Sequence, residues 1–212
     1  MCPIWTQGGY FMKKAVAGIL ALFVMCCMVA CGNTTPQQDT TPTAQTTPDT
    51  PADTASLEEK YPNFVTFDFP VSTLSDTLQE IMQTQFPDAM ASDPTVETTE
   101  DGDVIPANTS YTYDIGAGAT LTLYETTATQ KCYQVYLYAP ISGQDDLHNR
   151  IGYAMGGLLG LLEPDEETGN RIMTELNVTN VTEPATTMSF GDVSSWTYIV
   201  NENSIMFNVM AK

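Results

Sequence analysis

Residues 120–139 read TLTLYETTATQKCYQVYLYA, and this stretch predicts a β-hairpin. In both arms, apolar or aromatic residues alternate with other residues, which is the spacing of a strand with one buried face. The short polar stretch 127–130 separates the arms, and a loop of this kind joins antiparallel strands. We therefore expect strands over 120–126 and 132–139, and an antiparallel sheet built around them.

The same alternation predicts further strands on both sides of this hairpin. Upstream, residues 64–69 and 111–115 place an apolar or aromatic side chain at every second position. Downstream, we expect strands over 187–190, 195–200 and 204–210, with a tight turn between the last two.

Three helices are expected between and before the strands. The first covers residues 73–86 with Ser72 as its cap, the second follows Ser142, and the third begins at Pro164. The buried stripes are Leu74, Leu78, Ile81, Met82 and Phe86 in the first helix, and Leu147, Ile151, Met155, Leu158 and Leu162 in the second.

This order of elements predicts an α+β fold, in which helices pack on one face of an antiparallel sheet. It also fits two helix-plus-three-strand halves, because Ile115-Gly116 and Phe190-Gly191 precede their hairpins at the same spacing. We expect a single domain over 57–212, an acidic turn-rich loop over 87–108, and close packing of the glycines at 152, 156 and 160 on the sheet.

The N-terminal region has the features of a secretory signal. Lys13 and Lys14 precede an apolar run over 15–29, and a small residue, Ala30, stands before Cys31. The sequence MVAC at 28–31 resembles the bacterial lipobox, in which diacylglycerol is attached to the cysteine before cleavage on its amino side. Met28 departs mildly from the preferred leucine. The resemblance implies a lipoprotein signal peptide over 12–30 and a lipid on Cys31.

Two short segments flank this signal. Residues 1–11 carry no charge and fit poorly before it, so our hypothesis is that translation starts at Met12. Residues 31–56 comprise the lipidated cysteine and a Thr/Pro-rich stretch without a large apolar side chain, which we interpret as a disordered tether. The lipid would hold the protein on the extracytoplasmic side of the cell membrane.

The charge balance argues against nucleic acid as a partner. The chain has 26 acidic and seven basic residues, and loss of Lys13 and Lys14 with the signal changes the net charge from −19 to −21. Binding to nucleic acid requires basic residues that replace counterions, so we expect no nucleic-acid partner.

Of the five cysteines, only Cys132 would remain as a thiol, and no intrachain disulfide is expected.

The sequence predicts no catalytic residue, metal site or cofactor. His148 is the only histidine, and nothing pairs it with a nucleophile in the sequence. Cys132 is expected to be a buried thiol. The segment 100–103 is acidic but lacks the ligand spacing of a calcium loop, so we interpret it as a solvated turn.

The candidate binding residues are Tyr136 and Tyr138. Along 132–139, Tyr133, Val135 and Leu137 alternate with Cys132, Gln134 and the two tyrosines, which predicts that the tyrosines occupy the face opposite the core. Exposed aromatic rings on a sheet bind protein or polymer partners. The alternatives are a sheet covered by helices on both faces, or tyrosines that pack along strands, where their propensity is high.

These observations favour a non-enzymatic, lipid-anchored envelope protein that binds a protein or an envelope polymer through its sheet. The alternative is a small envelope hydrolase that uses carboxylates of the acidic loop. A solute-binding component of a transporter ranks last, because the domain is short for two lobes. The candidate carboxylates of the hydrolase are Asp93, Glu97, Asp101 and Asp103.

Overall fold

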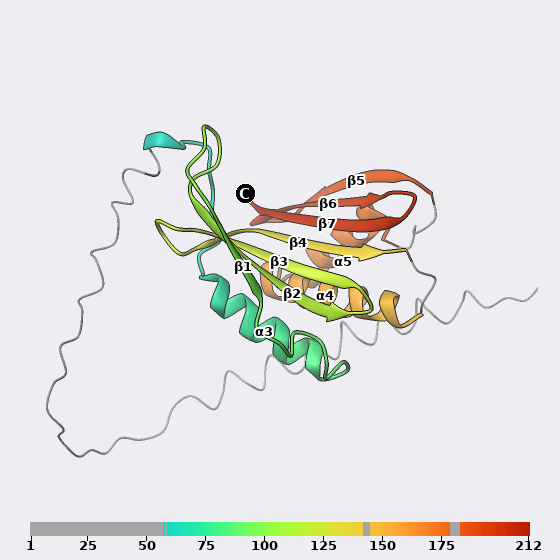
Figure 1. Ribbon diagram of the computed structural model, residues 1–212. Helices are drawn as coiled ribbons and strands as arrows, with labels where there is room; N and C mark the ends of the chain where they lie inside the picture. The colour runs from blue at the N-terminus through green and yellow to red at the C-terminus, as the bar shows by residue number, and fades with distance from the viewer. Residues whose placement is uncertain (1–56, 58, 142–144, 179–182) are drawn as a thin grey trace, which may run out of the picture.

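The computed structural model describes residues 57, 59–141, 145–178 and 183–212, so Cys31 and the expected tether lie outside the described residues. The described residues form an antiparallel seven-stranded sheet with three helices, which confirms the predicted α+β class. The strands lie in the order β1-β2-β3-β4-β7-β6-β5 (Figure 1). Their bounds are β1 Thr95–Thr99, β2 Asn108–Gly116, β3 Ala119–Thr126, β4 Cys132–Pro140, β5 Ala185–Phe190, β6 Ser194–Val200 and β7 Ser204–Ala211.

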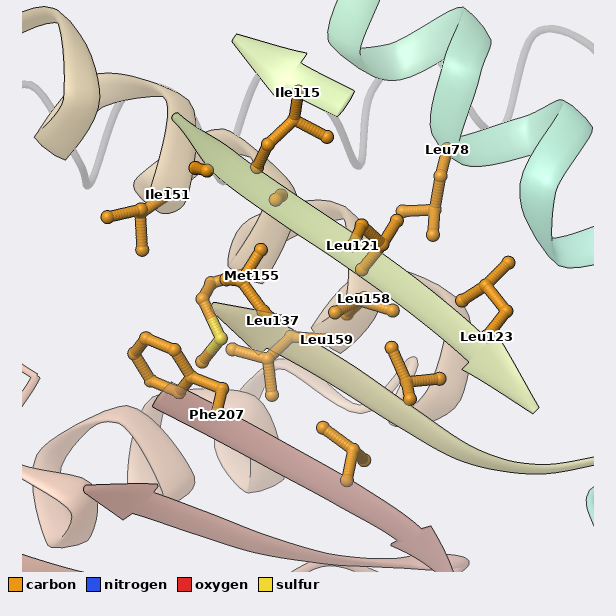
Figure 2. Close-up of a cluster of buried hydrophobic side chains, with 14 of the residues drawn as sticks. Leu78, Ile115, Leu121, Leu123, Leu137, Ile151, Met155, Leu158, Leu159 and Phe207 are labelled. Carbon is orange, nitrogen blue, oxygen red and sulfur yellow. The ribbon is translucent and has the colours of Figure 1, made fainter. Parts of the chain in front are cut away.

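The hairpin predicted over 120–139 is confirmed as strands β3 and β4. Leu121 pairs with Leu137 and Leu123 pairs with Val135, and all four side chains are buried. On the other side of β4, Leu137 pairs with Phe207 of β7. These side chains form the centre of the hydrophobic core between the sheet and the helices (Figure 2).

The helices cover one face of the sheet and leave the other face open (Figure 1). Helix α3 (Val71–Gln83) packs mainly on α4 (Asp145–Leu162) and touches β3, and α4 also contacts β2 and β4. Helix α5 (Glu166–Leu176) lies on β5 and β6. The stripe expected for α4 is buried throughout, whereas in the first helical stripe Leu74, Leu78 and Met82 are buried and Ile81 and Phe86 are half-buried.

The helix starts differ from the expectations. Helix α3 begins at Val71 without a side-chain cap, so Ser72 lies inside it. Helix α5 begins at Glu166, and the carboxylate of Asp165 caps it by accepting a hydrogen bond of 2.7 Å from the amide of Thr168. Pro164 therefore precedes the cap instead of starting the helix. The expected cap Ser142 lies outside the described residues.

The strand predicted over 64–69 is wrong. The amide of Phe67 donates to the carbonyl of Cys132 (2.7 Å), and the amide of Cys132 donates to the carbonyl of Phe69 (3.0 Å). Pro70 makes an isolated antiparallel bridge with Lys131, and the chain then enters α3 at Val71, so the pairing does not extend into a strand. Val65 is 45% exposed, whereas Phe67 is buried.

Strand β1 lies inside the stretch 87–108, for which the sequence predicts a loop. All of its residues are exposed, and it pairs with β2 at one edge of the sheet. A strand without a buried face shows no apolar alternation, and its sequence TVETT gave no periodic signal for this reason.

The glycines at 152, 156 and 160 do not pack on the sheet, contrary to our expectation. A Cβ added to Gly152 or Gly160 would meet no atom within 4 Å, and Gly156 and Gly160 line a groove between α4 and α5. The close approach occurs at Gly157, where a Cβ would lie 3.0 Å from Cδ2 of Leu78 on α3. The long apolar side chains of α4 occupy its sheet-facing side instead.

The strand order is consistent with two halves. Strands β2-β3-β4 on one side are matched by β5-β6-β7 on the other, and β4 pairs with β7 between them. Gly116 and Gly191 occupy matching positions, at the β2–β3 and β5–β6 connections. A Cβ on Gly116 would collide with the guanidinium of Arg150, and one on Gly191 would collide with the carboxylate of Glu163.

Candidate functional site

The open face of the sheet, which we define as the face turned away from the helices, carries Tyr136 and Tyr138. On β4 these two residues alternate with Val135 and Leu137, which are buried on the helix side. Tyr138 is 36% exposed and Tyr136 is half-buried. The candidate residues therefore share the face that the described helices leave uncovered.

Cross-strand pairing arranges the open face in three rows. Tyr136 stands between Thr122 of β3 and Asn208 of β7, and Tyr138 stands between Thr120 and Met206. Paired residues point to the same side of a sheet, so each row continues across the neighbouring strands. The rows are Glu97-Ser110-Tyr124-Gln134-Met210-Ser195-Phe190, then Thr95-Thr112-Thr122-Tyr136-Asn208-Thr197-Met188, then Asp114-Thr120-Tyr138-Met206-Ile199-Thr186.

Side-chain hydrogen bonds between β4 and β7 hold the centre of the open face in place. The hydroxyl of Tyr136 donates to Sδ of Met206 at 2.6 Å, and Nε2 of Gln134 donates to Oδ1 of Asn208 at 2.6 Å. Burial raises the pKa of Tyr136, so its hydroxyl stays protonated and remains a donor at neutral pH. The central tyrosine is thus preorganised.

The β5 end of the open face is apolar. Met188 is 56% exposed, Phe190 is 52% exposed and Met210 is 41% exposed. Met210 and Phe190 both pair with Ser195 of β6, so they lie in one row. Exposed apolar side chains that gather on one surface mark interaction sites in soluble proteins.

The sequence did not indicate this apolar end, because in β5 the polar side chains face the helices and the apolar side chains face outward. Its inward residues are polar: the hydroxyl of Thr187 donates to the carbonyl of Leu176 (2.6 Å), and that of Ser189 donates to Oε2 of Glu175 (2.5 Å). The methionine and phenylalanine of β5 consequently point outward. The alternation was visible, but it did not reveal which set of side chains faced the core.

The start of β4 departs from the predicted alternation. A register shift between Tyr124 and Glu125 sets Cys132 opposite Glu125. Cys132 therefore lies in the core, which confirms the expected buried thiol, although the alternation placed it on the face of Tyr136 and Tyr138. Tyr133 is also buried, but it packs against Tyr124 and Phe64, with ring centroids 6.0 Å and 4.9 Å away, instead of joining the main core cluster.

The candidate nucleophile and base lie apart from the open face. Cys132 has no exposed surface, and burial raises the pKa of its thiol to about 12, so the reactive thiolate does not form at neutral pH. His148 is exposed on α4, the helix layer. In the described part of the chain, no group of three or more His, Cys, Asp or Glu side chains is arranged to hold a metal ion.

The acidic loop fastens the start of the described chain to the sheet. Asp101 pairs with Lys60, accepts from the hydroxyl of Tyr61 at 2.5 Å, and accepts from the amide of Ala107 at 3.1 Å. The hydrogen bond from Lys60, then that from Tyr61, lowers the pKa of the Asp101 carboxyl. The other three carboxylates that the sequence analysis considered, Asp93, Glu97 and Asp103, are exposed.

Glu163 is a buried carboxylate that the sequence analysis did not single out. It follows α4 and accepts hydrogen bonds from the amides of Asp192 (2.8 Å), Val193 (3.1 Å) and Ser194 (3.0 Å). The hydroxyl of Ser194 adds a fourth bond of 2.5 Å. Glu163 thus fixes the β5–β6 turn, and no local pattern in the sequence indicates this long-range contact.

Comparison of the chain with family models, curated proteins and solved structures gave no match. Among the described residues, none of the helices has the length and apolar character needed to cross a membrane. The open face and its rows of side chains therefore carry the functional argument that follows.

Proposed function

We propose that this protein is a lipid-anchored component of the bacterial envelope and binds another envelope component on its open face. Cys31 would carry the lipid, as the resemblance of residues 28–31 to a lipobox implies. The domain would act as a binding module and catalyse no reaction. Its partner is a protein or an envelope polymer.

The exposure of apolar and aromatic side chains on the open face is the observation that carries this proposal. Tyr138, Met188, Phe190 and Met210 are each at least 36% exposed. Burying such side chains against a partner would remove apolar surface from water, at about 25 cal/mol for each Å². Other apolar residues are also exposed, Val104 most of all at 78%, but Met188, Phe190 and Met210 share the open face with the tyrosines.

Position-specific photo-crosslinking in intact cells tests the proposal. A benzophenone amino acid is placed at Tyr138 or Met188 on the open face, and at Glu80 or Asn170 on the exposed side of the helix layer. We expect adducts from the two open-face positions and none from the helix positions. A protein partner gives a discrete band, whereas a wall polymer gives high-mass material that a wall-degrading enzyme removes.

Two outcomes would contradict the proposal. One is the absence of any adduct at Tyr138 and Met188 in protein that reaches the membrane. The other is equal adduct formation at all four positions, which would indicate random collisions in a crowded envelope.

A further inference from the structure

The open face is acidic at one end and has no basic residue in its three rows. Glu97 of β1 and Asp114 of β2 are exposed and lie at the end opposite β5. Glu97 and Tyr124 lie in one row with Ser110 between them, and burial, then the charge of Glu97, raises the pKa of Tyr124. The face therefore combines carboxylates and tyrosines at one end with apolar side chains at the other.

The basic residues of the described chain are engaged elsewhere. Lys60 pairs with Asp101, and Lys131 pairs with Asp68. The other three basic residues also have partners. Arg150 contacts Asp88 and Asp146, Arg171 contacts Glu175, and Lys212 donates to the carbonyl of Gly191. None of these contacts involves Glu97 or Asp114, so a cationic partner would meet no competing ion pair at the acidic end of the face.

We propose that the occupant of the open face is a protein surface that carries lysine or arginine beside an apolar patch. This inference rests on the proposed function and specifies its partner. A cation near Glu97 or Asp114 would gain from the carboxylate and from neighbouring tyrosine rings. A neutral polymer would offer these carboxylates hydrogen bonds only, without a charge partner, and Oδ1 of Asp114 already accepts one from the amide of Gly116 at 2.7 Å.

The dimensions of the face favour a protein over a small ligand. Glu97 and Phe190 stand at opposite ends of one row, which crosses all seven strands. With about 4.8 Å between neighbouring strands, the two side chains lie about 29 Å apart. A partner that meets both ends must present cations and apolar groups over this distance.

Peptide probes test the inference on the full chain purified in detergent. The first probe is an extended nonapeptide with lysines in its first third, serines in the middle and phenylalanines in its last third. The second replaces each lysine by glutamine, and the third replaces each lysine by glutamate. We expect binding to weaken in this order, and the affinity of the lysine probe to fall as salt rises.

A pair of double variants with equal net charge separates local from general attraction. Glu97→Gln/Asp114→Asn removes the two carboxylates of the face, and Asp76→Asn/Glu202→Gln removes two exposed carboxylates on α3 and in the β6–β7 turn. We expect the first double variant to bind the lysine probe about fivefold more weakly. The second should bind as the unmodified chain does.

The outcomes that overturn the inference are distinct from those that overturn the proposed function. An equal loss in both double variants would show general attraction to an acidic chain. The protein could instead bind the lysine and glutamine probes equally well and lose this binding in Met188→Ser/Phe190→Ser. That result would reject a cationic partner but leave the open face as a binding surface. Absence of binding by the lysine probe would also reject the inference, and the crosslinking pattern then decides the proposed function independently.

Discussion

The carboxylate of Glu163 occupies the space that a side chain at Gly191 would need. Glu163 cannot move aside at low cost, because the amides of Asp192 to Ser194 and the hydroxyl of Ser194 bind it in a buried site. Glycine is therefore required at 191 for steric reasons, and the turn and the carboxylate fix each other.

We expect Gly191→Ala to lower the free energy of unfolding by about 1–3 kcal/mol, because the added methyl group displaces the carboxylate from its buried donors. Urea denaturation measures this change. Gly160→Ala is the matched control: its Cβ enters open space within α4, and alanine should raise helix stability by about 0.5–1 kcal/mol. Wild-type stability of Gly191→Ala would show that Glu163 is not held as described.

The contact between α3 and α4 predicts a second contrast among glycines. Gly157→Leu should destabilise the protein by about 1–3 kcal/mol, because its side chain would overpack against Leu78 and Ile81. Gly152→Leu should be tolerated, since a Cβ there meets nothing within 4 Å. Thermal denaturation of both variants checks the pair, and equal melting temperatures would count against this placement of α4.

The cap of α5 predicts a pH dependence of stability. The amide of Thr168 lowers the pKa of the Asp165 carboxyl below its unfolded value. A depressed folded-state pKa stabilises the fold above the unfolded pKa of about 4, and this stability is lost as the pH falls through the folded-state value. Asp165→Asn keeps a capping oxygen but removes the titration, so its stability should change less below pH 4.

Acid unfolding followed by circular dichroism measures this difference. Glu202→Gln, in the exposed β6–β7 turn, serves as the control with the same change in charge. If Asp165→Asn and Glu202→Gln lose stability equally as the pH falls below 4, the carboxylate of Asp165 does not stabilise α5 through its charge.

Thiol titration connects the buried Cys132 with processing of the N-terminus. In the native protein, a thiol reagent at pH 8 should not react with Cys132, since burial raises the pKa of this thiol to about 12 and no surface is exposed. After denaturation, the proposed mature lipoprotein should show one thiol, because Cys31 would carry the lipid and the other three cysteines would leave with the signal. A fast native reaction would contradict the burial, and more than one thiol would contradict the processing.

Lipidation itself is tested by metabolic labelling with an alkyne-tagged palmitate. We expect the wild-type protein to incorporate label and to partition with membranes, and Cys31→Ser to do neither. Cys27→Ser provides the matched control, because Cys27 lies inside the predicted signal peptide. Label on Cys31→Ser would place the lipid on another residue.

Burial on one face explains which strands could be predicted from the sequence. Strands β3, β4, β6 and β7 each set apolar residues against the helices and other residues outward, so their alternation revealed both existence and approximate bounds. Strand β1 has no buried face, and residues 64–69 alternate without forming a strand, because pairing beside Cys132 ends at Pro70. Alternation of apolar and polar residues therefore indicates that one face of a segment is buried. It does not by itself show that the segment pairs with another strand.

The candidate site was predictable only in part. Tyr136 and Tyr138 were found because their neighbours Val135 and Leu137 are strongly apolar. The register shift at Cys132 reversed the predicted side for two residues, and a shift of this kind leaves no mark in a single sequence. Met188 and Phe190 of β5 escaped notice because polar residues face inward there, where α5 supplies their hydrogen-bond partners.

The pairing of β4 with β7 has a consequence for how the chain folds. The other five strand pairings of the described sheet join strands that are consecutive in sequence, so each closes over a short connection. The β4–β7 pairing instead brings together residues such as Leu137 and Phe207, with two helices and two strands between them. Each meander can form locally, so the slow step should be the docking of β4 and β7, whose long-range contacts raise the contact order.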